Sequence, residues 1–183
     1  MPQQPLSPTL IADTAMDILD REGVAALSMR AIAVRLDVKA ASLYYHVRNK
    51  EALLQALVDR VAQEVNGNTD PAADWRPMLT AMAVRLRGLL RTHPGVTTVV
   101  ATKSVSPTVA QQIADRIGPP LAGKLNTTMD RALLLAQSLY VLVAGLALAE
   151  FGDVPHEPAA PRAYYDAWFD LAVGTFLDGI DTP

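Results

Sequence analysis

Two adjacent tyrosines and a histidine stand in the middle of the stretch LSMRAIAVRLDVKAASLYYHVRNKEALL, residues 27 to 54. Rings that carry polar groups are costly to bury without hydrogen-bond partners. We therefore expect Tyr44, Tyr45 and His46 either to be paired inside the protein or to face a polar ligand outside it.

The same stretch is positively charged within an acidic chain. Five cations and one acid lie between residues 27 and 50, which gives this segment a net charge of +4 and leaves −7 for the rest of a chain whose total is −3. This contrast predicts one surface that attracts phosphates on a body that repels them, and it excludes a protein that binds polyanions over its whole surface. The cations are Arg30, Arg35, Lys39, Arg48 and Lys50.

The spacing of apolar residues predicts how these side chains are held. Apolar residues three and four apart recur along all 183 residues, which predicts an all-α fold, and only VTTVV at 96–100 resembles a strand. Ser7 before Pro8, Ser28 and Asn49 are typical helix starts. The first helices are expected over about 8–21, over two short segments within 28–47 that meet at Asp37, and over 50–65.

The tract NGNTDPAAD at 66–74 predicts a boundary between two modules. We expect a small N-terminal module over residues 1–50, a connecting helix over 50–65, and a larger helical module over 66–183. In the larger module we expect helices at about 74–91, 95–103, 107–118, 127–151 and 160–178.

The second of the two short helices suits a DNA groove. Leu43 and Val47 are four residues apart and turn inward together, which turns the cationic and aromatic side chains of this helix outward. Two short helices joined by a tight turn can place one of them in a major groove about 12 Å wide. Small residues at Ala40 and Ala41 permit a close approach to the duplex.

The stretch resembles the DNA-binding domain of the TetR family of bacterial repressors, in the subgroup similar to the tetracycline repressor, and LYYHVRNKEALL is the most specific part. The resemblance implies a three-helix helix-turn-helix domain followed by a helical ligand-binding and dimerisation domain. It implies that Arg30 reads a base, a role that suits a guanidinium because it can bond to O6 and N7 of guanine at once. It also implies that Tyr44 and Lys50 hold phosphates. The predicted DNA-binding residues are Ser28, Met29, Arg30, Lys39, Ala40, Ala41, Ser42, Tyr44, Tyr45, His46 and Lys50.

The chain departs from this family in two places. Asp37 stands where the family's turn usually has glycine, and aspartate tolerates the left-handed conformation better than most residues. In the tetracycline repressor a histidine and a glutamate help to hold a magnesium–drug complex; Glu150 could be comparable, but GVTTVVATK lacks the histidine, so tetracycline is not the expected effector. Asp153, His156 and Glu157 lie in a proline-broken loop without the fixed spacing of metal ligands, and no metal or cofactor is predicted.

The tract ALLLAQSLYVLVAGLALA, residues 132–149, is apolar on every side. It approaches the length of a membrane span, but Gln137 and Ser138 interrupt it and charged residues flank it closely. We favour a helix that a second subunit helps to bury, so that this helix and the one near 164–180 form a four-helix bundle in a homodimer. The predicted interface residues are Leu134, Leu142, Tyr165, Trp168, Phe169, Ala172 and Phe176.

The helices near 74–91, 95–103 and 127–151 are expected to converge on a pocket for an apolar effector with few polar anchors. A stripe of methionine and aromatic residues is also typical of an ordinary core, and His93 before Pro94 fits a helix end as well as a pocket. The predicted pocket residues are Trp75, Met78, Met82, Leu86, His93, Val100, Gln137, Tyr140, Val141 and Ala144.

Together these patterns predict a cytoplasmic, ligand-responsive transcriptional repressor that binds a near-palindromic DNA operator as a homodimer, with half-sites about 34 Å apart. Two alternatives stay open: a helical dimeric interaction module, and a small helical enzyme with a histidine base. The enzyme is disfavoured because GxGxxG, GxxxxGK[ST], GxSxG and HExxH are all absent and there is no cysteine. Residues 1–20 do not resemble a signal peptide.

Overall fold

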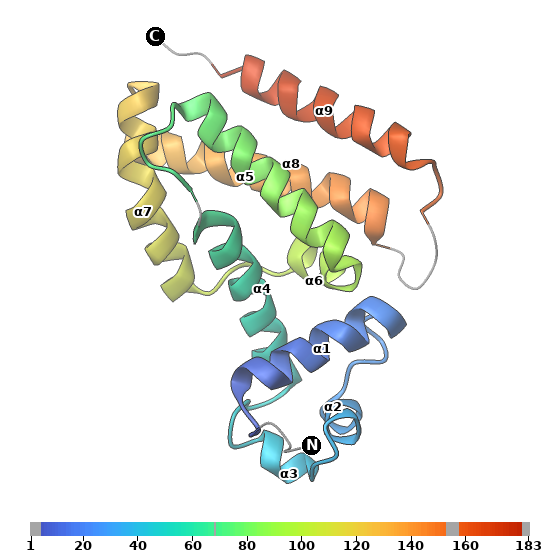
Figure 1. Cartoon of the computed structure of the whole chain (residues 1–183). Coiled ribbons are helices and arrows are strands. Elements are labelled where there is room, and N and C mark those ends of the chain that lie inside the picture. Colours follow the sequence, from blue (N-terminus) through green and yellow to red (C-terminus); the bar gives the residue numbers. More distant parts are fainter. Residues whose placement is uncertain (1–4, 68, 153–157, 181–183) are drawn as a thin grey trace.

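The computed structural model describes residues 5–67, 69–152 and 158–180, and within these ranges every regular element is a helix. Figure 1 shows a small head, made by the first three helices, below a larger body, with α4 running from one to the other. The all-α prediction is confirmed. The elements are α1 (Pro8–Glu22), α2 (Met29–Arg35), α3 (Ala40–Leu43), α4 (Lys50–Gly67), α5 (Trp75–Thr92), η1 (Pro94–Val96), α6 (Thr97–Thr102), α7 (Pro107–Leu125), α8 (Met129–Phe151) and α9 (Arg162–Asp178).

Polar side chains fix the starts of these helices. Ser7 Oγ accepts a hydrogen bond from Leu10 N at 3.2 Å, and Ser28 Oγ accepts one from Ala31 N at 3.0 Å. Asn49 Oδ1 does the same for Ala52 N at 2.8 Å. Each bond satisfies a backbone N–H that has no partner inside its own helix, which is why the predicted starts are accurate.

The helix expected at about 95–103 is present as η1 and α6, but the end predicted for α7 was wrong. VTTVV, which resembles a strand, lies in η1 and α6. α7 does not end near residue 118 but continues through Pro119 and Pro120 to Leu125. The two prolines remove the N–H groups that would bond to the carbonyls of Asp115 and Arg116, but both of these residues are exposed, so water can satisfy the carbonyls.

In the body α8 packs against α5, α6, α7 and α9, with its inward face built from buried residues such as Ala136, Leu139 and Val143. Its outer face remains exposed, and Leu134 there is 64% exposed. By length and composition α8 is the one helix in the described ranges that could cross a membrane, which is weak evidence because a core helix of a soluble protein passes the same test.

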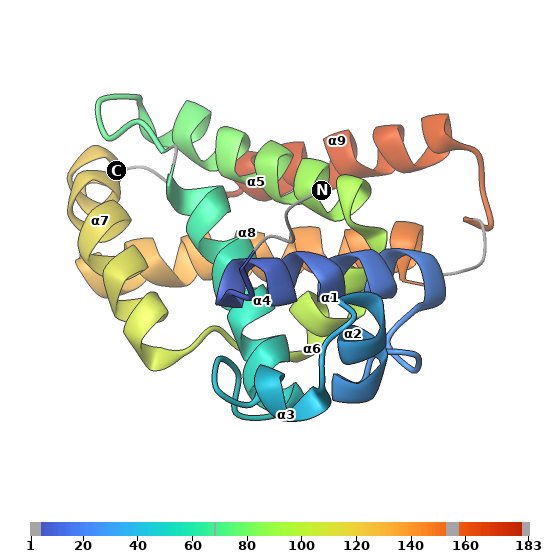
Figure 2. The ribbon, with the colours of Figure 1, turned by 60° about the horizontal axis from the view of Figure 1, so that its bottom comes forward.

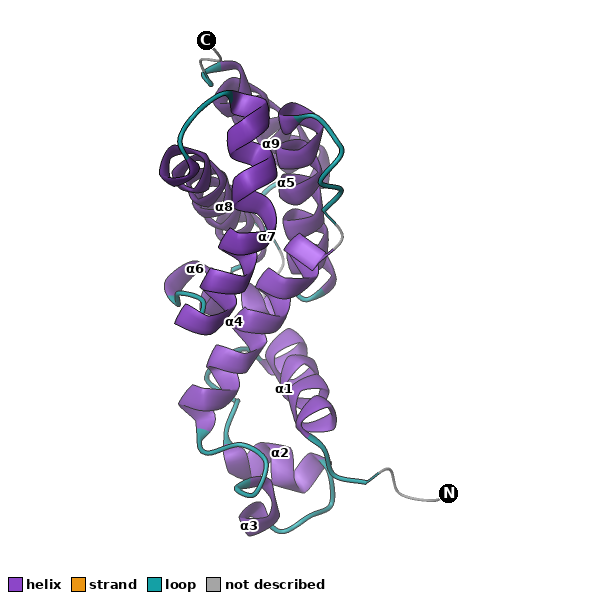
Figure 3. Cartoon of the chain, turned by 90° about the vertical axis from the view of Figure 1, so that its left-hand side faces the viewer, coloured by secondary structure: helices purple, strands orange, loops and turns teal. Residues whose placement is uncertain are grey.

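The head is joined to the body by α4 and by a second contact between α1 and η1. Figure 2, seen from the head, shows α1 crossing in front of α4, and Figure 3 shows α2 and α3 at the end of the molecule opposite α9. The outer end of the head, which α2 and α3 form and which we call the tip, is therefore separated from the core of the body by the length of α4.

Candidate nucleic-acid interface and ligand cavity

A left-handed residue shapes the turn between α2 and α3. Asp37 has a φ of 53°, as expected for a position where glycine is usual. Val38 N donates to Ala33 O at 3.0 Å and Asp37 N donates to Val34 O at 3.3 Å, which is the pair of bonds of a Schellman motif. This motif ends α2 and sends the chain directly into α3.

The turn exposes the aromatic and imidazole rings at the tip. Leu43 is fully buried and Val47 is half-buried, whereas Tyr45 is 90% exposed and Tyr44 and His46 are also exposed. None of the three rings has a hydrogen bond to a described residue. The rings are therefore not paired inside the chain and are available to a ligand.

The other predicted DNA-binding residues are distributed over α2, α3 and the start of α4. Arg30, Lys39 and Ala41 are exposed, and Ala40 and Ser42 are half-buried. Ser28 is exposed, and its hydroxyl caps α2. Met29 is a correction: it is 9% exposed and belongs to the hydrophobic core, so its side chain is not part of this surface. It occupies the first turn of α2 on the face that packs inward.

Only some of the five cations are free to attract phosphates. Arg35 is bonded to Asp17 at 2.9 Å and to Glu22, so its charge holds α2 against α1. Lys50 Nζ donates to the Val24 carbonyl oxygen at 3.3 Å and keeps its charge. Arg30, Lys39 and Arg48 have no ion pair with any described residue.

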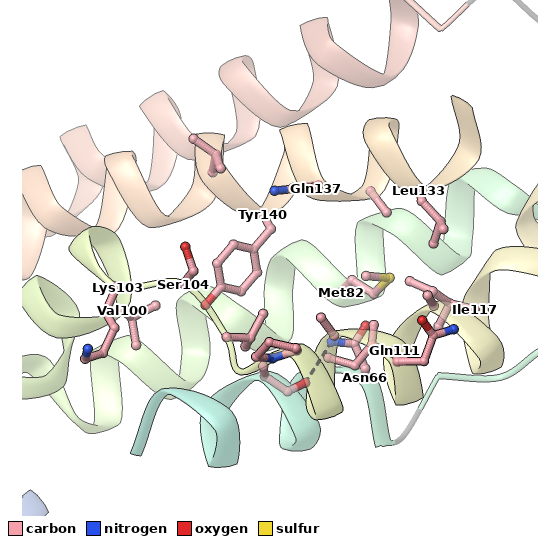
Figure 4. A pocket seen from close by; sticks show the side chains of 18 of the residues that line it. Asn66, Met82, Val100, Lys103, Ser104, Gln111, Ile117, Leu133, Gln137 and Tyr140 are labelled. Atoms are coloured by element: carbon pink, nitrogen blue, oxygen red, sulfur yellow. Dashed lines mark hydrogen bonds between the residues drawn. The ribbon is translucent and has the colours of Figure 1, made fainter. Parts of the chain in front are cut away.

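The body contains a cavity of about 550 Å³. Its walls come from α4, α5, α6, the segment between α6 and α7, α7 and α8 (Figure 4). This volume is within the range of sites for small organic molecules. Five of the predicted residues line it, namely Met82, Val100, Gln137, Tyr140 and Val141.

The other five predicted pocket residues lie elsewhere, which corrects the prediction. Met78, Leu86 and Ala144 are buried in the core, and Trp75 packs against that core from the start of α5. His93 ends α5, as the helix-end interpretation had it. Residues that the sequence reading missed come from α4 and α7, among them Asn66, Gln111 and Ile117; the helical spacing of Ala110, Ala114 and Ile117 was the signal for α7.

Burial changes the titration of one cavity residue. The ring of Tyr140 projects from α8 into the cavity (Figure 4), and burial raises the pKa of its phenol to about 12. Tyr140 therefore stays protonated at neutral pH and keeps an O–H group that can donate.

Comparison with known proteins relates the N-terminal head, and the chain as a whole, to one family. The sequence profile described as "Bacterial regulatory proteins, tetR family" matches residues 11–57, which run from α1 into α4. An HTH-type transcriptional regulator of Saccharopolyspora erythraea is 36% identical over 156 residues, which is 84% of this chain and 56% of that protein. The chain belongs to the TetR family.

Further relatives of this TetR-family chain include a class A tetracycline repressor of Escherichia coli, 39% identical over 87 residues, or 46% of this chain and 40% of the relative. The matched regions thus span about half the length of these relatives. A TetR variant from Acinetobacter baumannii AYE, solved in complex with minocycline, has a TM-score of 0.81 at 23% identity and covers 95% of this chain and 96% of its own. That likeness shows a shared fold.

In this TetR-family chain His93 belongs to the joint between α1 and η1. Asp20 Oδ2 lies 2.8 Å from His93 Nδ1, and Asp20 Oδ1 accepts from Gly95 N at 2.9 Å. Gly95 lies against the backbone of α1 so closely that a Cβ atom there would come within 2.0 Å of the Leu19 carbonyl oxygen. The joint is therefore tight enough to require glycine.

In the ranges that the structure describes, acidic and imidazole side chains do not cluster into a metal site. No group of three or more histidine, aspartate or glutamate side chains there could hold a metal. Glu150 is buried and accepts from Arg87 at 2.8 and 3.0 Å, so it is part of an ion pair between α5 and α8 and not of the cavity. Asp153, His156 and Glu157 lie outside the described residues.

The proposed interface helices present apolar side chains, but not all of those predicted. Leu134 and Trp168 are exposed, whereas Leu142, Ala172 and Phe176 are half-buried and pack against the core. Tyr165 and Phe169 are buried within the chain, which corrects the prediction that they face a partner. Phe169 instead packs under Arg87, whose guanidinium carbon lies 4.7 Å from its ring centre. Leu171, which was not predicted, is among the exposed residues of α9.

Proposed function

We propose that this chain is a ligand-responsive transcriptional regulator, acting as a repressor, that binds a near-palindromic operator as a homodimer. The observation that supports it most is that one helix, α4, both leads from the exposed cationic tip and forms a wall of the cavity. We assign residues 1–50 to the DNA-binding head and 66–183 to the ligand-binding and dimerisation body. The proposal gives the chain no catalytic role and places it in the cytoplasm, with its DNA.

On the DNA side, α3 enters the major groove. The exposed rings of Tyr45 and His46 reach base edges or the adjoining backbone, Arg30 bonds a guanine, and Tyr44 and Lys50 hold phosphates. Lys50 opens α4, where free backbone N–H groups also favour an anion. Two heads of a dimer then read half-sites about 34 Å apart.

The dimer is formed by the outer faces of α8 and α9. Exposed apolar side chains recur there at helical spacing, with Leu134, Val141 and Leu148 on α8 and Trp168 and Leu171 on α9. Two such helices from each chain make a four-helix bundle, which removes this apolar surface from water.

Three bonds connect the cavity wall to α4. Lys103 pairs with Glu51, Gln55 Nε2 donates to Ser104 O at 3.0 Å, and Ser106 N donates to Asp59 Oδ1 at 2.8 Å. Residues 51, 55 and 59 lie four apart on one face of α4, and residues 103 and 104 line the cavity. A ligand that displaces this wall therefore moves α4 and favours a head spacing that fits DNA poorly.

Binding of DNA from upstream of the protein's own gene, measured by gel shift at two salt concentrations, tests the proposal. Lys50→Ala is expected to weaken binding to every duplex and to lower the salt slope by about one unit, because one phosphate contact is lost. Arg30→Ala is expected to relax preference at one base pair, a loss of about 1–3 kcal/mol in discrimination.

A parent protein that shows no salt-dependent binding of duplex DNA would support the interaction module or the enzyme instead. Arg35→Ala is a matched control for charge, because Arg35 is occupied by Asp17 and Glu22. If Lys50→Ala and Arg30→Ala bind random and operator duplexes as the parent does, the head assignment is wrong.

A further inference from the structure

Two polar atoms in the residues that line the cavity have no hydrogen-bond partner in the described chain. They are the hydroxyl oxygen of Tyr140, on α8, and the side-chain oxygen Oδ1 of Asn66, on α4. Asn66 is only 6% exposed, so water reaches it poorly. Because buried polar atoms are nearly always paired, two unpaired atoms among the residues that line one cavity call for a specific explanation.

The direction of each unpaired group is defined. The amide nitrogen of Asn66 donates to the Ala62 carbonyl oxygen at 2.7 Å, which holds the amide and leaves Oδ1 as an acceptor. The phenol of Tyr140 stays protonated and so offers its O–H as a donor. Among the residues that line the cavity, α4 thus contributes one unpaired acceptor and α8 one unpaired donor (Figure 4).

The rest of the lining offers almost no charge. Among the described lining residues the one charged side chain is Lys103, and its ammonium is paired with Glu51. No aspartate, glutamate, arginine or histidine is among them. An ionised ligand would lose its hydration there without gaining a counter-charge, and a metal chelate would find no carboxylate or imidazole.

We infer that the cavity selects an uncharged, mainly apolar molecule that carries a hydrogen-bond donor for Asn66 Oδ1 and an acceptor for the Tyr140 hydroxyl. This inference rests on the proposed function, since it names the chemical class of the effector. The apolar remainder of such a molecule packs against Met82, Val100 and Ile117. Contact with Asn66 and with the 103–105 segment places the molecule directly on the connection to α4.

Three β-substituted naphthalenes of similar size test the inference in ligand-observed NMR titrations: β-naphthol, its methyl ether and β-naphthoate. Fragments of this size bind with a Kd on the order of 1 mM or tighter where they fit. We expect β-naphthol to bind about 3- to 10-fold more tightly than the ether, which has lost the donor, and β-naphthoate to bind more weakly than either. Equal or tighter binding of the naphthoate, or no binding of β-naphthol at about 1 mM, would overturn the inference.

Substitutions identify the groups responsible. In Asn66→Leu the preference for β-naphthol over the ether is expected to disappear. Tyr140→Phe is expected to weaken the binding of both β-naphthol and the ether about 3- to 10-fold. Gln111→Leu is the matched control, because Gln111 also lines the cavity but its amide already bonds to Asp115 at 2.8 Å. An unchanged preference in folded Asn66→Leu contradicts the assignment, and the comparison of the three compounds on the parent stands even if a variant does not fold.

Gel shift with the same preparations separates this inference from the proposed function. If the parent protein shows no preference for β-naphthol but binds the operator, the inferred class of ligand is wrong and the proposed function stands. Selective binding of β-naphthol by a protein that binds no duplex DNA supports the cavity assignment and overturns the proposed regulator.

Discussion

Asp37 shows how one residue controls the angle of the tip. Its left-handed conformation closes the Schellman motif that ends α2, and α3 begins three residues later. Aspartate is one of the few residues other than glycine that adopt this conformation, although at a cost of roughly 1–2 kcal/mol. The strained residue therefore lies in the turn that sets the direction of α3 relative to α2.

Replacement of Asp37 by glycine is expected to stabilise the protein. Relief of the left-handed strain exceeds the greater chain entropy of glycine, so we expect a gain of about 0.5–1 kcal/mol in the free energy of unfolding, measured in urea. Asp37→Val is the opposing control, since a β-branched residue resists a positive φ, and it should destabilise by more than about 1 kcal/mol. Glycine and valine variants of equal stability would show that residue 37 is not left-handed.

At the scale of single residues the sequence predicts helix caps well and cavity residues poorly. Caps such as Ser7, Ser28 and Asn49 depend on bonds to residues three positions ahead, which a sequence displays directly. Whether Met78 or Met82 faces the cavity depends on the rotation of α5 against α8, which apolar spacing does not specify. Asn66 was missed because it lies at the end of a helix in a tract that reads as a loop.

At the scale of helices the joint between α1 and η1 limits how the head can move. Asp20 binds both His93 and the backbone of Gly95, and α1 touches η1 without space for a side chain at residue 95. The head is thus connected to the body at two points, and a shift of α4 must turn the head about this joint. The two-residue tie could not be predicted, because Asp20 and His93 are far apart in the sequence.

Gly95→Ala is expected to destabilise the protein by about 1–3 kcal/mol, because the added methyl group collides with backbone that cannot yield. Gly88→Ala, within α5, is the matched control: a Cβ there meets nothing within 4 Å, and alanine favours a helix interior by about 1 kcal/mol. Guanidinium unfolding of both variants measures the contrast. If Gly95→Ala is as stable as the parent, the close contact between η1 and α1 is absent.

Helix ends were least predictable in α7. A pair of prolines normally stops a helix, and IGPPLAGK was read as a connection for that reason. The helix continues because Asp115 and Arg116 lie on its exposed side, where water can satisfy their carbonyls, and because Ile117, Leu121 and Leu125 are buried on its inner face. Burial of that face outweighs the lost hydrogen bonds, a balance that depends on tertiary packing.

At the scale of the whole molecule the exposed apolar stripe on α8 and α9 is the surface through which we propose that two chains associate. The sequence predicted a dimer through these two helices and assigned Tyr165 and Phe169 to its interface, because apolar residues of one helix look alike whether they face their own core or a partner. The buried ion pair of Arg87 and Glu150, with Asp166 at 2.9 Å from Arg87, holds α9 in its orientation. Desolvation by itself raises the pKa of the Asp166 carboxyl, but the hydrogen bonds and charges of Arg91 and Arg87 together lower it below its usual value, so these contacts persist at neutral pH.

Leu171→Glu combined with Leu134→Glu is expected to separate the proposed dimer. The exposed fractions of these leucines, 70% and 64%, become buried in a bundle, and uncompensated charges there should raise the dimer dissociation constant roughly 100-fold or more. Val34→Glu, at an exposed apolar position in the head, should leave assembly unchanged. Sedimentation analysis measures the mass of each variant in solution. An unaltered dimer mass for the double variant would exclude this interface.

The walls of the cavity divide into two groups with different freedom to change during evolution. Substitutions in α4 alter the stalk of the head as well as one wall of the cavity, whereas substitutions of the cavity-lining side chains of α7 and α8 leave that stalk unchanged. Under the proposed function, descendants of this protein can therefore acquire new effectors through α7 and α8 while keeping the same operator. The two kinds of recognition that we propose for this chain can then diverge independently.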